Sequence, residues 1–177
     1  IVAQVVYYFT AAATLGAPYR KVAFTVPTGN FGDIFAGYVA ARMGLPVDRL
    51  VIATNVNDIL VRTLATGSYE VREVVATASP SMDIQVSSNF ERLLFDASGR
   101  DAAEVRRLMA QLTQSRRFSL SSRALEQIRA LFSADRADEE ETAATIRTTL
   151  RETSRLVDPH TAVGLAVAEK EEARDPA

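Results

Sequence analysis

Two glycines, Gly29 and Gly32, lie in the segment Pro27–Asp33, between an apolar run and a stretch with helical spacing. The backbone N–H groups at the start of a helix have no partner within the helix, and together they favour an anion. Glycine lets the chain bend there and lets an anion come close to the backbone. The segment therefore predicts either a phosphate-binding turn or an ordinary connection in which the glycines only shape the loop.

The segment differs from the two commonest phosphate-binding loops. It does not end in the Gly-Lys-Ser or Gly-Lys-Thr sequence of a P-loop, so no lysine follows to reach a terminal phosphate. It also lacks the first Gly-x-Gly of the dinucleotide fingerprint. ATP and NAD are therefore disfavoured, and a cofactor with a single phosphate fits better.

The elements that position this turn follow from the spacing of apolar residues. The first 15 residues predict an amphipathic helix, and Val22–Val26 predicts a buried strand. Helical spacing from Asp33 to Met43 is followed by a second apolar run, Leu50–Thr54. Strand, helix and strand in this order indicate a βαβ unit whose parallel sheet is covered on both faces.

The second half of the chain has a helical character. We expect short helices after Asn57 and over 89–96. Further apolar stripes are formed by Val105, Leu108, Met109 and Leu112, and by Leu125, Ile128, Leu131 and Phe132. The acidic run Asp138–Glu141 suits the first turn of a helix, and a last helix begins near Pro159 and ends in the charged stretch 170–175. We therefore expect an α/β portion that binds phosphate (1–100), a helical region (101–155) and a returning helix (156–177).

Composition excludes several classes of protein. Without cysteine there are no disulfides, thiolate metal sites or cysteine nucleophiles, and with His160 as the single histidine we expect no metal site. A net charge of −2 argues against a nucleic-acid module. No run approaches the roughly 18 apolar residues of a membrane span, and no signal peptide is seen. We expect a cytoplasmic protein without membrane contact, and a chain that opens at Ile1 in mid-pattern, as a cut chain would.

Several polar residues are candidates for a binding site. Asn55, Asn57 and Asp58 follow the second strand, where ligands collect in parallel sheets, but Asn57 or Asp58 also suits the cap of the next helix. Arg92 suits either a substrate phosphate or solvent, and His160 suits either a first helical turn or a general base. Ser88 or Asn89 can cap the helix that follows them, and the individual roles of Ser87, Ser88, Asn89 and Arg92 stay open.

Four segments carry a resemblance to a known family: Val26–Gly37, Ile52–Asn55 with Asn57–Asp58, Ser81–Arg92 and Asp158–Gly164. In sequence, order and spacing they resemble threonine synthase, a fold-type II enzyme that depends on pyridoxal 5'-phosphate (PLP). The resemblance covers nearly the whole chain. It implies an α/β fold similar to the tryptophan synthase β subunit: a partial doubly wound parallel sheet with flanking helices and a mainly helical C-terminal region.

The resemblance also implies a reaction and a site. The family's enzymes are lyases that convert O-phosphohomoserine and water into threonine and inorganic phosphate. By similarity, Gly29, Asn30, Phe31, Gly32 and Asp33 cradle the PLP phosphate. Asp33 would contribute its backbone N–H, because its carboxylate repels a phosphate, and its side chain would brace the turn.

Asp158-Pro159-His160-Thr161 suits a helix start with Asp158 as the N-cap. We expect this cap to leave the Thr161 hydroxyl free. By resemblance, Thr161 faces the pyridine nitrogen of PLP, where a neutral hydroxyl can donate a hydrogen bond to an unprotonated nitrogen.

The chain departs from the family pattern at one decisive point. The family's Schiff-base lysine lies in an upstream Phe-Lys-Asp segment, which this sequence lacks. Lys21 and Lys170 are expected to be surface lysines. The chain thus resembles the C-terminal half of the enzyme, without a catalytic residue of its own and needing the remainder of the enzyme to complete its site. Two alternatives stay open: a binding module for another phosphorylated metabolite, and a non-catalytic phosphate-cofactor-binding fragment or pseudoenzyme.

Overall fold

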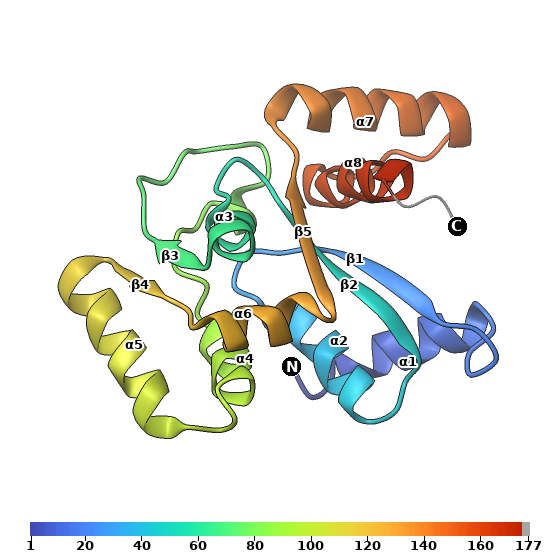
Figure 1. Ribbon diagram of the computed structural model, residues 1–177. Helices are drawn as coiled ribbons and strands as arrows, with labels where there is room; N and C mark the ends of the chain where they lie inside the picture. The colour runs from blue at the N-terminus through green and yellow to red at the C-terminus, as the bar shows by residue number, and fades with distance from the viewer. Residues whose placement is uncertain (175–177) are drawn as a thin grey trace.

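A computed structural model describes residues 1–174 of the chain (Figure 1). Its elements in chain order are α1 (Val5–Thr14), β1 (Val22–Pro27), α2 (Gly32–Arg42), β2 (Val47–Thr54), α3 (Ile59–Thr66), β3 (Ser68–Glu70), the 3-10 turn η1 (Pro80–Met82), α4 (Phe90–Ala97), α5 (Ala102–Ser115), β4 (Arg117–Ser119), α6 (Ser122–Arg129), β5 (Phe132–Arg136), α7 (Glu139–Thr153) and α8 (Pro159–Arg174). The predicted charged end extends to Asp175, which lies outside the described residues.

The central sheet is parallel and has the strand order β1-β2-β5. Val26 pairs with Ile52 of β2, and Ile52 pairs with Ala134 of β5. The predicted βαβ unit is confirmed, since β1 and β2 are parallel neighbours joined through α2. Strands β3 and β4 form a separate antiparallel pair.

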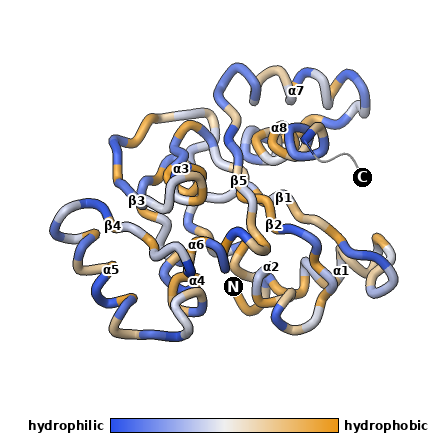
Figure 2. The backbone as a smooth tube through the Cα atoms, viewed as in Figure 1, coloured by the Kyte–Doolittle hydropathy of each residue, from blue (hydrophilic) through white to orange (hydrophobic). Residues whose placement is uncertain are grey.

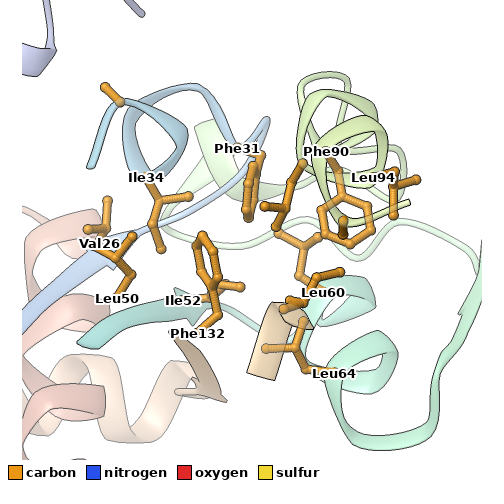
Figure 3. Packing of buried hydrophobic residues seen from close by; sticks show 14 of the residues in the cluster. Val26, Phe31, Ile34, Leu50, Ile52, Leu60, Leu64, Phe90, Leu94 and Phe132 are labelled. Atoms are coloured by element: carbon orange, nitrogen blue, oxygen red, sulfur yellow. The ribbon is translucent and has the colours of Figure 1, made fainter. Parts of the chain in front are cut away.

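The sheet is covered on both faces, which explains the unbroken apolar run in β2. Leu50 and Ile52 point into the larger core, with residues of α2, α3 and α4 (Figure 3). Val51 and Ala53 point to the opposite face, where they meet Val163 and other residues of α8. The expected fold class, a partial doubly wound parallel sheet with flanking helices, is confirmed.

The helix α7 packs on α8, on the side away from the sheet (Figure 1). Most of its residues are hydrophilic, as Figure 2 shows. Asp138 accepts a hydrogen bond from the backbone N–H of Glu141, and the Glu141 side chain accepts one from the N–H of Asp138, both at 2.9 Å. The acidic run therefore starts a helix with a complete capping box, as we predicted. None of the helices in the described part of the chain is long and apolar enough to cross a membrane.

One predicted element is wrong in its extent. We expected Leu131 and Phe132 to continue a helical stripe, but α6 ends at Arg129 and Phe132 begins β5. Phe132 is buried and its ring lies 5.8 Å from that of Phe31, whereas the rest of β5 is only partly buried. The region 101–155 thus contains the strands β4 and β5 as well as helices, and β5 completes the parallel sheet. The domain boundaries stay a prediction.

Candidate functional site

The segment Pro27–Asp33 connects the carboxyl end of β1 to the start of α2. Phe31 occupies the position before the helix with a left-handed φ of 67°. This conformation costs a residue with a side chain about 1–2 kcal/mol. Its ring is buried beside Phe90, with ring centroids 5.3 Å apart (Figure 3). Packing of the ring therefore holds the backbone of the turn in a conformation that turns of this kind use to gather N–H groups around an anion.

Most backbone N–H groups of the turn are unpaired. The N–H of Gly32 donates to Oδ1 of Asn30 at 2.9 Å, so this donor is already occupied. Within residues 1–174 no acceptor is found for the backbone N–H groups of Gly29, Asn30, Phe31 and Asp33. A group of unpaired donors at the amino end of a helix is suited to a phosphate.

The carbonyl groups of the turn, in contrast, are held by a second segment. The Ser87 hydroxyl donates to the carbonyl oxygen of Gly29 at 2.8 Å. The backbone N–H and the side-chain amide of Asn89 both donate to the carbonyl oxygen of Asn30 at 3.0 Å. The side chain of the exposed Arg92 does not contact the turn directly in these bonds; it donates to Oδ1 of Asn89 at 3.0 Å. Ser87 and Asn89 therefore support the turn from one side.

The two glycines of the turn are required for different reasons. A Cβ on Gly29 would lie 2.5 Å from the backbone oxygen of Ser81. Glycine is required at position 29 because a side chain there would collide with the backbone of this neighbouring segment. A Cβ on Gly32 would lie 3.0 Å from Oδ1 of Asn30. The nearest atoms to that Cβ outside the helix backbone belong to the side chains of Asn30 and Asn89. Gly32 is therefore the better residue with which to test the turn alone.

The Asp33 side chain points away from the turn's free donors towards α1. The Tyr8 hydroxyl donates to the Asp33 carbonyl oxygen at 3.0 Å and lies 3.3 Å from its carboxylate oxygen Oδ1. Burial, together with the Asp33 carboxylate, raises the pKa of Tyr8 well above its usual value, so this hydroxyl stays protonated as a donor. The carboxylate thus braces α1 against α2.

The start of α8 is organised by Asp158. Its carboxylate accepts the backbone N–H of His160 at 2.9 Å and the hydroxyl of Thr161 at 2.5 Å, so Asp158 caps the helix as expected. The expectation that the Thr161 hydroxyl is left free is wrong, because this hydroxyl donates a hydrogen bond to the Asp158 carboxylate. This hydrogen bond is the main reason why the pKa of Asp158 is lowered to about 2. An ionised carboxylate only accepts, so the Thr161 hydroxyl must be the donor of this pair.

The start of α8 and the glycine turn meet at the same end of the sheet. The ring nitrogen Nε2 of His160 accepts the backbone N–H of Ser81 at 3.2 Å, and the loop at Ser81 is the one that abuts Gly29. One turn further along α8, a Cβ on Gly164 would lie 3.0 Å from the ring of Pro27. The structure therefore brings together two of the regions that the sequence singled out, 27–33 and 158–164.

The His160 side chain connects the segment at Ser81 to the start of α8. Its Nδ1 lies 3.0 Å from the Asp158 carboxylate while Nε2 accepts from Ser81. With both ring nitrogens in hydrogen bonds, the residue has the role of a polar group in a first helical turn. The alternative of a general base gains no support from this geometry.

Asn55 and Asn57 serve a buried polar network. The Asn55 side-chain amide donates to Thr77, Ser79 and Asp83 at 2.9, 3.0 and 2.7 Å. Although burial acts to raise the pKa of Asp83, hydrogen bonds from Thr77 and Asn55 lower it below its usual value. The two asparagines therefore fasten the long loop after β3 to the end of β2. Thr77 and Ser79 were not identified from the sequence as partners, and Asp83 was identified only as part of the family-like segment Ser81–Arg92.

The expected helix caps after β2 and before α4 are wrong. Asp58 precedes α3 but its side chain does not cap it; it forms ion pairs with Arg62 and Arg136, both at 2.8 Å. Asn89 precedes α4 without a capping side-chain bond, because its amide N–H group donates to Asn30 and its Oδ1 accepts from the Arg92 side chain. In both cases a tertiary contact replaces the local hydrogen bond.

Neither Lys21 nor Lys170 lies where its amine could form a Schiff base with a cofactor bound at the turn. The Lys170 ammonium lies 2.6 Å from the Glu141 carboxylate and donates to the carbonyl oxygen of Arg136 at 2.8 Å. Lys21 is exposed and precedes β1, at the opposite end of that strand from the turn. Among residues 1–174 no three His, Asp or Glu side chains group so that they could hold a metal ion.

Comparison with known proteins relates the chain to the threonine synthases. No family model matches the chain. The threonine synthase of Pseudomonas aeruginosa is 51% identical over 168 residues, which cover 95% of this chain and 36% of that protein. The crystal structure of a PLP-bound threonine synthase from Brucella melitensis superposes with a TM-score of 0.95 and 64% identity, over 96% of this chain and 37% of that one.

The yeast threonine synthase structure gives a TM-score of 0.91 and 41% identity, over 99% of this chain and 38% of that one. The chain thus spans a little over a third of the length of the relatives that it matches. The resemblance that the four sequence segments predict is confirmed. In sequence and in fold, the chain is a relative of the threonine synthases.

Proposed function

We propose that this chain is the part of a threonine synthase that binds the phosphate of PLP. One observation carries the proposal: the turn at 29–33 presents unpaired backbone N–H groups at a helix start, in a chain 64% identical to a structure solved with PLP. PLP, when bound, supplies the electron sink for the reaction, while the protein supplies binding and orientation. The proposed reaction converts O-phosphohomoserine and water into threonine and inorganic phosphate.

The residues of this chain would bind and orient the cofactor. The N–H groups of Asn30, Phe31 and Asp33 would bind the phosphate, and the Gly32 N–H would stay with the Asn30 side chain. The Schiff-base lysine would come from the remainder of the enzyme, which is needed to complete the site. The cytoplasmic location of the protein stays a prediction from its composition.

The O–H bond of Thr161 has a defined direction, because it donates a hydrogen bond to the Asp158 carboxylate. Its oxygen can therefore only accept a hydrogen bond from a further group. If Thr161 faces the ring nitrogen of PLP, as we propose, it fits a nitrogen that carries a proton. This replaces our expectation that the hydroxyl donates to an unprotonated nitrogen.

Thr161→Val in the full-length enzyme is expected to lower activity by about ten- to a hundredfold, the value of one hydrogen bond that involves a charged group. The same change is expected to raise the pKa of Asp158 from about 2 towards its usual value. A lowered carboxyl pKa stabilises the folded state at pH values above the unfolded value. This stabilisation disappears as the pH falls towards 2, and the valine variant would lack most of it. Activity assays and carboxyl NMR titration of Asp158 measure the two effects.

Thr161→Ser is the matched control, because it keeps the hydroxyl and should keep most of the activity. A fully active valine variant would show that Thr161 has no contact with the cofactor.

The function itself is tested by a product assay on the full-length protein with PLP and O-phosphohomoserine. We expect threonine and inorganic phosphate to appear in equal amounts. PLP binding without either product would instead favour the alternative of a non-catalytic, phosphate-cofactor-binding protein.

A further inference from the structure

The segment Ser87–Asn89 touches the glycine turn at two neighbouring peptide groups. We propose that Ser87 and Asn89 are positioning residues, which orient these peptide groups so that the N–H groups of Asn30 and Phe31 face the phosphate. This inference rests on the proposed function, since it takes the bound group to be the phosphate of PLP.

The orientation follows from the geometry of the peptide bond. In a trans peptide the C=O and N–H groups point in opposite directions. The Gly29 carbonyl points at the Ser87 hydroxyl, 2.8 Å away, so the N–H of Asn30 points away from Ser87. The Asn30 carbonyl points at two donors of Asn89, each 3.0 Å away, so the N–H of Phe31 points away from Asn89. Both donors therefore face the side opposite the supporting segment.

The supporting segment is itself fixed in the core. The backbone N–H of Ser87 donates to the hydroxyl oxygen of Tyr69 at 2.8 Å. The ring of Tyr69 is 1% exposed and stacks between Phe118 and Phe90, with centroid distances of 4.7 and 5.6 Å. Phe90 also packs edge-on against Phe31 of the turn. The turn and its support are therefore joined by polar contacts and by a continuous aromatic stack.

The hydrogen bonds from Ser87 and Asn89 decide which groups of the turn an anion meets. Rotation of either peptide group would present a carbonyl oxygen to the phosphate in place of an N–H, and the like partial charges would repel. Ser87 and Asn89 stabilise the orientation that presents the donors. Neither side chain needs to touch the cofactor for this effect.

Ser88 provides a matched control next to the residue under test. It is exposed, and within residues 1–174 its side chain has no hydrogen bond to the turn. Ser87→Ala and Ser88→Ala therefore remove the same hydroxyl group from adjacent positions, and only the first removes a contact with the turn.

The experiment measures the dissociation constants of PLP and of pyridoxal, which lacks the phosphate, for variants of the full-length enzyme. Ser87→Ala should weaken PLP binding by about three- to tenfold, the range of one net hydrogen bond, and leave pyridoxal binding unchanged. Asn89→Ala, at a less buried position, should have the same selective effect. Ser88→Ala should change neither constant.

Two results would overturn the inference. One is an equal loss of PLP and pyridoxal affinity in Ser87→Ala and Asn89→Ala, which would indicate general damage to the site. The other is a PLP affinity of both variants that equals that of Ser88→Ala. A wild-type enzyme that binds PLP no better than pyridoxal would be a different failure, because it would contradict the proposed function itself.

Discussion

An isolated chain of these 177 residues is expected to form no threonine from O-phosphohomoserine, even with PLP added. Without a Schiff-base lysine the cofactor is held only by non-covalent contacts, and the exchange of one amine for another on the cofactor has no starting point. Lys170 is paired with Glu141, and Lys21 lies at the end of β1 away from the turn. The measurement is a product assay that runs the full-length enzyme in parallel as the positive control.

Borohydride reduction in the presence of PLP provides the second readout. It should trap an adduct on a lysine of the full-length enzyme and none on the isolated chain. Turnover by the isolated chain, or a trapped adduct on Lys21 or Lys170, would contradict this prediction.

Gly32→Val in the full-length enzyme should weaken PLP binding by about ten- to a hundredfold. The reason is that the added Cβ would lie 3.0 Å from Oδ1 of Asn30, whose side chain shapes the turn by accepting the N–H of residue 32. Displacement of that side chain disturbs the adjacent phosphate donors, and a hydrogen bond to a charged group contributes about 1.5–3 kcal/mol. Titration of the variant with PLP measures the loss.

The sheet should stay folded in this variant, because the atoms nearest to the added Cβ belong to side chains. Gly29→Val is the informative comparison, since a side chain there would also collide with the backbone of Ser81 and should disturb the fold. A normal PLP affinity for Gly32→Val would mean that this glycine only shapes a loop.

The sequence predicted those elements whose burial produces a regular pattern. Residues 50–53 of strand β2 are buried on both faces of the sheet, so they form a continuous apolar run. The turn before α2 was predicted from its two glycines. Strand β5 was missed because only Phe132 is fully buried, and Ser133 and Asp135 would suit a loop equally well.

The site was predicted less completely, because several of its contacts join residues far apart in the chain. Ser87 meets Gly29 over 58 positions, and the Asn55 amide finds Thr77 and Asp83 over 22 and 28 positions. Local spacing does not encode such contacts. The Thr161 hydroxyl was assigned wrongly for a different reason: the Asp158 carboxylate has two oxygens and caps the backbone while also accepting this hydroxyl.

The most direct test of the account is a crystal structure of the full-length enzyme with PLP bound. We expect phosphate oxygens at about 2.7–3.2 Å from the backbone nitrogens of at least two of Asn30, Phe31 and Asp33, with Ser87 and Asn89 still bonded to the carbonyls of the turn. A phosphate bound elsewhere, with these N–H groups satisfied by water or by protein, would contradict the account.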